Sequence, residues 1–426
     1  MNYPDTYYSR TLADRLERPA LSGQIECDTV VIGGGLAGLT TALQLARGGQ
    51  RVVVLEAKSV GFGASGRNGG FVSAGYSTGE DQIARISGAT KAHQLHLMSI
   101  EGVDFVRDTI ARLGIAGVDP VDGITSVMRY DDGDGMRAYA EVSRSKYGQE
   151  LDYLDTAKVR QNLKSKRYFH GLRDRKAFHI HPLNYLRGIA AEIERLGGAI
   201  YEDSPALSTD LSSGNKQVCT SAGTVKARTV VLSTGGYTDG LNARLKRAFL
   251  PIATYVMVSE VAPDLLASAI NTRDGIGDNR RAGDYYRLVE GGKRLLWGGR
   301  ITTRAASTAG MLEELRREMT NTYPQLRELK TELAWSGLMA YARHLMPQIG
   351  EMQPGVWHCT AFGGHGLNTT AIGGKIVAEA ILGESDRYRL FAPFGLAWAG
   401  GAAGLAVAQL TYWKLQAQDW WRERAA

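Results

Sequence analysis

The chain is poor in cysteine, and its cysteines are not spaced as metal or redox pairs. Cys27, Cys219 and Cys359 are the only three among 426 residues. Without a CxxC motif or clustered cysteines, neither a zinc ribbon nor a disulfide scaffold is expected. We therefore expect no bound metal and a reducing, cytoplasmic setting.

Two further patterns are missing, a secretory leader and a basic tract. Residues 1–19 are polar and aromatic, without the charged-then-apolar order of a signal peptide. The net charge is +6, but no run of five basic residues occurs, which argues against a nucleic-acid partner. With 44% hydrophobic and 22% charged residues, the chain has a globular composition. Its length favours two domains over a single core.

The opening part of the chain contains a strand–helix–strand pattern. Residues 28–33 are an apolar strand, residues 36–47 have helical periodicity, and residues 51–55 form a second strand. Gly33, Gly35 and Gly38 complete a GxGxxG motif between the first strand and the helix. In this context the motif predicts dinucleotide binding, with the pyrophosphate at the helix start. Glu56 then follows the second strand and can accept hydrogen bonds from a ribose.

Three later features favour FAD over NAD. The loop 58–70 is rich in glycine and can curve around a flat ligand, with Arg67 and Asn68 as polar contacts. An apolar strand at 229–232 ends in a second glycine turn at Thr234 and Gly235. A strand at 356–361 leads through a GGHG turn into a helix without side-chain caps. The start of that helix would stabilise the negative charge of a reduced flavin.

With these motifs assembled, the sequence resembles the FAD-dependent amine and amino-acid oxidases. This family includes D-amino-acid, glycine and sarcosine oxidases, and the likeness is greatest to gamma-glutamylputrescine oxidases. The resemblance is carried by Tyr7-Tyr8 and by VVLEAKSVGFGASGRNGG, HIHPLNYLRG, DYYRLVEGGKRLLWGGR, YPQL and GGHG. These stretches span nearly the whole chain.

The resemblance implies an α/β (α+β) architecture. A Rossmann-type FAD domain would combine residues 27–84, 160–245 and 340–385, and a mixed-sheet substrate domain would combine residues 85–159 and 246–339. An N-terminal arm (1–26) and a C-terminal helical extension (386–426) would complete the chain. The resemblance also implies that backbone near Leu207 contacts the adenine. Because relatives with covalent FAD use a histidine or cysteine where this chain has none, we expect non-covalent FAD.

The predicted cofactor-binding residues come from these turns. They are Gly33, Gly35, Leu36, Ala37, Gly38, Glu56, Ala57, Lys58, Gly63, Ala64, Ser65, Arg67, Asn68, Gly69, Gly70, Leu207, Thr234, Gly235, Gly363, Gly364, His365, Gly366, Leu367 and Thr369.

The predicted reaction is oxidation of an amine C–N bond. Hydride passes from the α-carbon to flavin N5, the imine hydrolyses, and O2 reoxidises the flavin to give hydrogen peroxide. Aromatic residues suit an amine cation, and an arginine suits a carboxylate. Such residues occur in the strand 254–260 and in a hairpin at 284–300 that turns at Gly291-Gly292. The predicted catalytic residues are Tyr255, Tyr286, Trp297, Arg300 and His365.

Each of these assignments has a structural alternative. The aromatic residues and Arg300 suit ordinary sheet packing, and His365 suits a helix cap. Arg343 and His344 suit either the flavin edge or a structural role, whereas a structural role is favoured for His179 and His181. The predicted partners are a small-molecule amine and O2. A dehydrogenase that passes electrons to a quinone, a non-catalytic FAD module and an NAD enzyme remain alternatives.

The C-terminal segment reads as a helix over residues 401–426. Ala406, Leu410, Trp413, Ala417 and Trp421 share one apolar face, which we expect to pack on the protein body or on a partner subunit. Trp420 and two arginines near the end resemble an interfacial anchor, so membrane contact is the less favoured alternative. The stretch 395–413 is close to the length that spans a bilayer. The substrate amine and the oligomeric state stay open.

Overall fold

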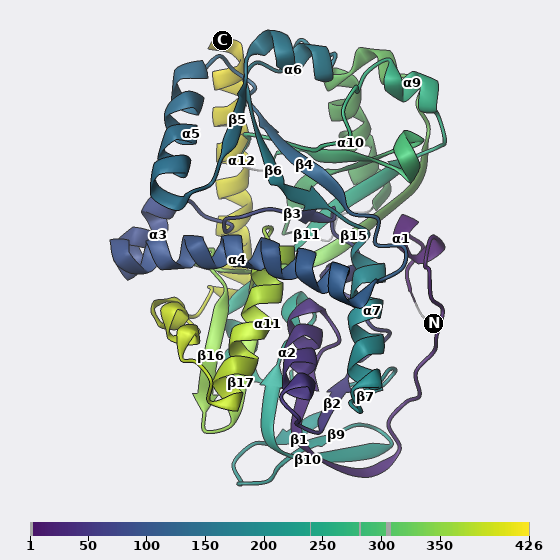
Figure 1. Ribbon diagram of the computed structural model, residues 1–426, viewed down its shortest axis with the longest axis vertical. Helices are drawn as coiled ribbons and strands as arrows, with labels where there is room; N and C mark the ends of the chain where they lie inside the picture. Colours follow the sequence, from purple (N-terminus) through teal and green to yellow (C-terminus); the bar gives the residue numbers. More distant parts are fainter. Residues whose placement is uncertain (1–2, 239, 281–282, 304–307, 426) are drawn as a thin grey trace.

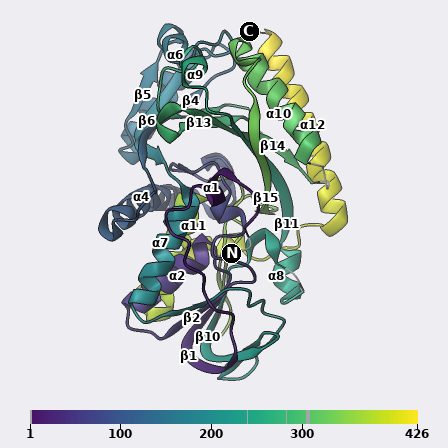
Figure 2. The ribbon, with the colours of Figure 1, turned by 90° about the vertical axis from the view of Figure 1, so that its right-hand side faces the viewer.

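The computed structural model describes residues 3–238, 240–280, 283–303 and 308–425. These residues fold around two β-sheets (Figure 1). Within these residues the first sheet has eight strands and the second has nine. The first sheet lies at one end of the molecule and the second at the other (Figures 1 and 2).

The first sheet is parallel at its centre. β1 lies between β2 and β10, with Val31 opposite both Val54 and Val231. Its path runs β16 (Gln348–Gln353), β17 (Val356–Thr360), β10 (Gly223–Leu232), β1 (Gly23–Ile32), β2 (Val52–Leu55) and β7 (Ala199–Tyr201), with β8 (Ser208–Asp210) and β9 (Lys216–Cys219) joined to β10. The apolar runs of these strands are buried on both faces, as in a parallel α/β sheet.

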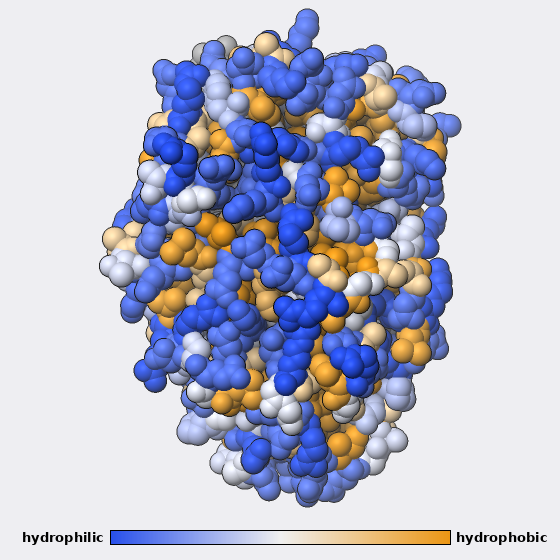
Figure 3. All heavy atoms as spheres, in the orientation of Figure 1, coloured by the Kyte–Doolittle hydropathy of each residue, from blue (hydrophilic) through white to orange (hydrophobic). Residues whose placement is uncertain are grey.

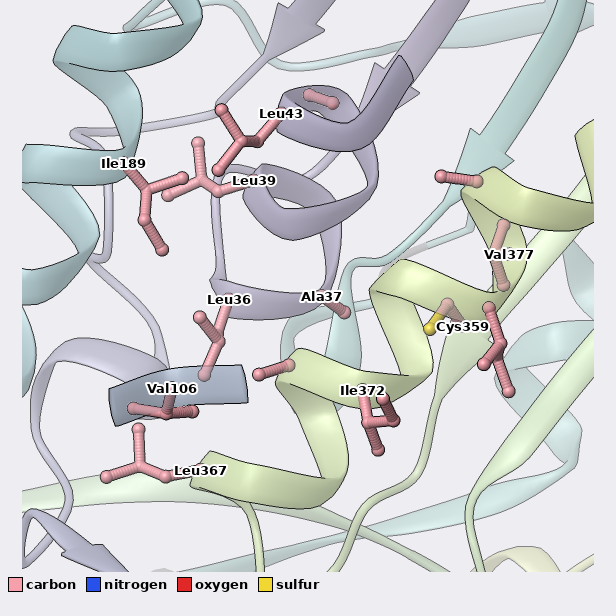
Figure 4. Packing of buried hydrophobic residues seen from close by; sticks show 14 of the residues in the cluster. Leu36, Ala37, Leu39, Leu43, Val106, Ile189, Cys359, Leu367, Ile372 and Val377 are labelled. Carbon is pink, nitrogen blue, oxygen red and sulfur yellow. The ribbon is translucent and has the colours of Figure 1, made fainter. Parts of the chain in front are cut away.

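Three helices cover one face of this sheet, and a long helix crosses them. They are α2 (Leu36–Arg47), α7 (Pro182–Arg195) and α11 (Leu367–Leu382), crossed by α4 (Ala89–Leu113) (Figure 1). Side chains of all four meet in one core, where Leu39 of α2 lies near Ile189 of α7 and Leu367 of α11 lies near Val106 of α4 (Figure 4). This packing fixes where α2 and α11 begin.

The second sheet is mostly antiparallel and has helices on its outer side. Its path runs β15 (Thr331–Ala342), β11 (Phe249–Ser259), β14 (Arg294–Thr302), β13 (Tyr285–Val289), β12 (Gly275–Asp278), β4 (Val121–Val127), β6 (Gly171–His179) and β3 (Phe71–Val72), with β5 (Leu151–Leu154) joined to β6. Helices α10 (Thr308–Thr322) and α12 (Gly401–Ala425) both lie on its outer side (Figure 2). The other helices are α1 (Tyr7–Arg10), α3 (Glu80–Ser87), α5 (Gly133–Tyr147), α6 (Thr156–Asn162), α8 (Ala243–Arg247) and α9 (Pro263–Ala267).

Several elements follow the sequence prediction. The strand–helix–strand unit is present, β13 and β14 form the predicted hairpin, and a helix covers residues 401–425. Among the described residues, no helix combines the length and apolar character needed to cross a bilayer. The face that surrounds α3, α4 and α5 is largely hydrophilic, with hydrophobic residues scattered over it (Figure 3).

The domain boundaries remain a proposal, which the strand pairing refines. Strand β6 pairs with β4 in the second sheet, although it lies within the predicted FAD segment 160–245. We therefore propose that this segment begins at α7, after β6.

The apolar face predicted for the C-terminal helix packs differently from our expectation. Leu410, Trp413 and Trp421 are exposed, whereas the polar residue Gln409 is buried against the end of β14. Its side-chain oxygen accepts a hydrogen bond from the Thr303 N–H at 3.1 Å. Hydrogen bonding to the backbone at this end of β14 therefore turns the polar face inward.

Candidate functional site

The first glycine turn joins β1 to α2 and has no room for side chains. Gly33 has φ +112°, and a Cβ there would lie 2.6 Å from the Ser233 carbonyl oxygen. At Gly38 a Cβ would lie 2.0 Å from the Gly33 carbonyl oxygen. Helix α2 therefore starts directly against the ends of β1 and β10.

The start of α2 is largely uncapped and faces the loop that follows β2. Gly35 is its N-cap and supplies no side-chain hydrogen bond. The Leu36 N–H donates to Ser65 Oγ at 3.1 Å. Ala37 and Gly38 complete the first turn, so this helix start offers N–H groups and a partial positive charge to a phosphate.

Glu56 lies beside this turn. Its Oε2 accepts a hydrogen bond from the Gly34 N–H at 2.7 Å, and its Oε1 accepts one from the Lys58 N–H at 2.9 Å. Burial raises the pKa of Glu56, and hydrogen bonds from Lys58, Gly34 and Ala57 oppose that rise. These three hydrogen bonds occupy three of the four lone-pair positions of the carboxylate, so one acceptor position is left for a ribose hydroxyl.

The glycine-rich loop after Glu56 is organised by its own polar side chains. The Asn68 amide donates to the carbonyl oxygens of Ala64 and Ser65, and its oxygen accepts from the Gly70 N–H. Asn68 thus holds the loop together internally. Gly63 precedes the short 3-10 helix Ala64–Gly66, and a Cβ at Gly63 would lie 3.3 Å from the Tyr237 ring.

Arg67 is the loop residue with a free donor. Its Nε donates to the Phe62 carbonyl at 2.6 Å, and its guanidinium carbon lies 4.5 Å from the Phe62 ring centre. Its Nη1 donates to the Ser336 carbonyl at 3.2 Å. Its Nη2 is buried and has no hydrogen-bond partner in the described part of the chain. A buried donor of this kind fits an acceptor on a bound cofactor.

The second helix start follows β17. Gly363 has φ +62°, and Gly366 caps α11 without a side-chain bond. His365 Nε2 lies 3.0 Å from the Ala74 carbonyl and 3.1 Å from the Ser73 carbonyl, so it donates to them. Burial lowers the pKa of His365, which keeps the ring neutral. His365 therefore ties this turn to the segment after β3, while Thr369 Oγ1 donates to the His365 carbonyl.

The two helix starts open at the same edge of the first sheet. β1, β10 and β17 are parallel neighbours, so their carboxyl ends lie together. The third turn, at Thr234 and Gly235, follows β10 between the other two. Helix α11 packs directly on α2, because Thr41 Oγ1 donates to the Gly374 carbonyl at 3.1 Å (Figure 4). Ligands of open α/β sheets bind at this edge.

Leu207 lies in the β8–β9 region. Its N–H donates to the Cys219 carbonyl at 2.8 Å, and its side chain is 61% exposed. Its contact with adenine stays a prediction.

Four predicted catalytic residues lie on the outer side of the second sheet. Tyr286 and Trp297 are 0% exposed, and their rings stack at 4.3 Å between centres. The Tyr286 hydroxyl lies 2.7 Å from the Tyr323 hydroxyl, next to α10. Tyr255 belongs to the same core cluster. These aromatic residues are core residues, which corrects the prediction that they line the substrate cavity.

Arg300, the fourth of these residues, has an ion-pair partner on the outer side of the sheet. Its Nη2 forms an ion pair with Glu318 of α10 at 3.0 Å, inside a buried charge cluster that contains Arg129, Arg280, Asp278 and Asp284. The prediction that Arg300 binds a substrate carboxylate is therefore wrong in its placement. Arg300 has φ +57°, and the register of β11 against β14 shifts between Thr254 and Tyr255, so an irregularity near the end of β14 brings Arg300 to the same side as Trp297.

The opposite face of the same strands meets the cofactor turns. A Cβ at Gly69 would lie 2.5 Å from the Tyr285 ring, and one at Gly364 would lie 2.5 Å from the Tyr341 hydroxyl and 3.7 Å from Met339 Sδ. Tyr285 and Tyr341 are only half-buried. Burial raises the pKa of both, that of Tyr341 to about 12. Tyr285, Tyr341 and Met339 were not among the predicted site residues, because alternation along the hairpin separates Tyr285 from Tyr286 without showing which of the two faces the cofactor turns.

Arg287, also missed, links four segments behind the loop. Its Nε donates to the Gly69 carbonyl at 2.7 Å, and its Nη2 donates to the Ile180 carbonyl at 2.7 Å and to the Tyr8 hydroxyl at 3.1 Å. Its Nη1 lies 3.0 Å from His179 Nδ1. Arg287 therefore holds Gly69 in place against the segments that contain Tyr8 and Ile180.

The remaining histidines have structural partners. Burial lowers the pKa of His179 and of His181 to about 3, so both are neutral near pH 7. His181 Nδ1 accepts from the Asn184 N–H at the start of α7. Arg343 is exposed, and His344 packs against Phe394, so neither is brought to the glycine turns. Among the described residues no cluster of metal-ligating side chains occurs.

Comparisons with known proteins agree with this architecture. A family model described as FAD dependent oxidoreductase matches residues 28–380. The chain is 33% identical over 392 residues to the probable oxidoreductase OrdL of Haemophilus influenzae, covering 91% of this chain and 90% of that protein. It is 33% identical over 396 residues to gamma-glutamylputrescine oxidoreductase of Escherichia coli, covering 92% of each.

A solved structure shares the fold. The glycine oxidase of Geobacillus kaustophilus aligns with a TM-score of 0.74 at 18% identity, covering 88% of this chain and 99% of that chain. The predicted fold class and the choice of FAD as cofactor are thereby confirmed.

Replacing Gly38 tests the first turn. Gly38→Ala places a methyl group against the Gly33 carbonyl, and we expect a loss of unfolding free energy on the order of 1–3 kcal/mol together with a lower FAD content. Thermal unfolding and flavin absorbance measure both. Gly214→Ala is the control, because a Cβ there meets nothing within 4 Å. Equal unfolding free energy and equal FAD content in the two variants would contradict the inference that the turn has no room for a side chain at Gly38.

Replacing Arg287 tests the support of the loop. Arg287→Met leaves the Gly69 and Ile180 carbonyls without their donor, so we expect the FAD dissociation constant to rise at least about tenfold. Flavin fluorescence on titration of the apoprotein measures it. Arg294→Met on the paired strand is the control, since Arg294 binds the exposed edge acids Glu290 and Glu332. A smaller rise of the FAD dissociation constant in Arg287→Met than in Arg294→Met would disprove the role of Arg287 in supporting the loop.

Proposed function

The chain belongs to the family of FAD-dependent oxidoreductases, and we propose that it is an oxidase that converts an amine to an aldehyde or oxo product with O2 as electron acceptor. The family assignment makes it a flavoenzyme that acts on amine C–N donors. The identity of the amine and the use of O2 are part of the proposal.

The half-buried pair Tyr285 and Tyr341 carries the proposal. Both rings lie against glycine turns, Tyr285 at Gly69 and Tyr341 at Gly364, on the side of the second sheet that faces the cofactor domain. Aromatic faces attract an amine cation, and Met339 beside Tyr341 adds an apolar wall. Their raised pKa values keep both hydroxyls protonated near pH 7. They can therefore orient an amine but not remove its proton as bases.

The residues at the two helix starts fit FAD. The uncapped start of α2 suits the pyrophosphate, Glu56 the ribose, and the free Nη2 of Arg67 an acceptor on the cofactor. The start of α11 adds a second partial positive charge at the same sheet edge. Bound FAD would supply the acceptor for a hydride from the carbon next to the amine nitrogen, and the resulting imine would be hydrolysed by water.

Non-covalent attachment is part of the same proposal. Loop residues Arg67 and Asn68 provide no nucleophile, and Cys359 is 1% exposed within the core beneath α11. We further propose a γ-glutamylated amine as substrate, since a relative at 33% identity bears the name gamma-glutamylputrescine oxidoreductase.

Anaerobic mixing tests the reaction and the acceptor. We expect γ-glutamylputrescine to bleach the flavin absorbance more than putrescine, sarcosine or glycine does, and air to restore it with one peroxide per turnover. Bleaching by none of the amines would contradict the amine substrate. Restoration by a quinone without peroxide would establish a dehydrogenase instead.

Substitutions on the two sheet faces test the substrate site. We expect Tyr285→Leu and Tyr341→Leu each to raise KM by about three- to thirtyfold, because a cation–aromatic contact is lost. Tyr286→Phe is the control, since it removes only the hydroxyl that contacts Tyr168 and Tyr323 on the outer face. The free energy of unfolding of the Tyr286→Phe variant should fall by about 1 kcal/mol, while its KM stays unchanged. A KM change at 286 matching that at 285 would reject the assignment of faces.

A further inference from the structure

Helix α12 attaches to the body through its polar residues. Gln409 accepts hydrogen bonds from the Thr303 N–H at 3.1 Å and the Thr303 hydroxyl at 3.2 Å. The Tyr412 hydroxyl accepts from the Ile301 N–H at 3.3 Å. Near its end, Glu423 pairs with Arg167 at 3.1 Å. The helix is thus held to the body by one side, at its middle and near its end.

The opposite side of α12 is exposed and carries large hydrophobic residues. We call its five large hydrophobic residues the outer stripe. Trp413 is 46% exposed and Trp421 is 70% exposed. The outer stripe consists of Val407, Leu410, Trp413, Trp420 and Trp421. Five large hydrophobic side chains exposed on one helix are unusual for a protein surface, so the stripe indicates an interaction site. Figure 2 shows α12 at the outer edge of the molecule, where a flat partner can reach it.

The charges on α12 divide between its two sides. The exposed charged residues are Lys414, Arg422 and Arg424, all cations. The two acids, Asp419 and Glu423, are half-buried toward the body. Arg424 also lies over the Trp420 ring, with its guanidinium carbon 3.8 Å from the ring centre. The exposed side therefore combines tryptophans, aliphatic residues and positive charge.

We propose that the outer stripe docks on an anionic lipid surface, with α12 lying in the plane of the interface. Tryptophans and leucines on one side of a surface helix enter the headgroup region, and basic residues beside them bind anionic headgroups. A second copy fits less well, because the exposed charges of α12 are all positive and two copies of this helix would offer each other no opposite charge. This inference is independent of the proposed reaction, since α12 contributes no residue to the cofactor turns.

Vesicle sedimentation of the FAD-loaded protein tests the proposal. Vesicles of phosphatidylcholine and phosphatidylglycerol in equal parts should pellet the protein at low salt, and pure phosphatidylcholine should pellet much less. Added salt should release it, because exposed charges are screened. The double variants Trp420→Ser/Trp421→Ser and Lys414→Glu/Arg424→Glu should each weaken binding at least about tenfold.

Controls separate loss of binding from loss of folding. Tyr139→Ser changes a residue that is 57% exposed on α5, and its binding should equal that of the parent protein. Flavin absorbance and thermal unfolding should match in all variants. The charge variant leaves every tryptophan in place, so it reports on the surface even if the tryptophan variant misfolds.

Three results would overturn the proposal. The first is that the protein binds neither vesicle type, and the second is that it binds both types equally. The third is that light scattering gives twice the mass of one chain, that the tryptophan variant returns to the single mass, and that neither protein binds vesicles. The last result would assign the outer stripe to a contact between two copies.

Discussion

The close approach of α2 to the ends of β1 and β10 is the constraint on which the site depends. Gly33 and Gly38 leave no volume for a Cβ, so the helix start lies directly at the sheet edge. Helix α11 is then placed by contact with α2 at Gly374, where a Cβ would lie 2.6 Å from the Ala37 carbonyl oxygen. Two helix starts with free N–H groups therefore share one edge because small residues permit this packing.

The second sheet has a structural side and a cofactor side. On the outer side, stacked aromatic rings and a buried cluster of arginines and carboxylates join the sheet to α10 and α12. On the inner side, Arg287 holds Gly69 and Tyr8 in place. Rigid packing behind the sheet thereby supports the position of Tyr285 and of the glycine-rich loop in front of it.

The C-terminal helix shows that amphipathic pattern alone does not decide which side faces inward. Backbone N–H groups at the end of β14 need acceptors, and Gln409 and Tyr412 provide them. Satisfying these donors orients the polar side toward the body. The tryptophans are then left at the surface, together with the cations of the same helix.

The sequence by itself determined the strand–helix–strand unit, the three glycine turns, the β13–β14 hairpin and hence the class of cofactor. These features depend on residues close together in the chain, whose spacing limits the backbone to one geometry. The sequence could not decide between Tyr285 and Tyr286, or reveal that Arg287 holds Gly69. Those facts depend on which sheet face is covered by α10, and on contacts between segments more than a hundred residues apart. Only the tertiary structure decides them, because a strand offers both of its faces equally until another layer packs on one.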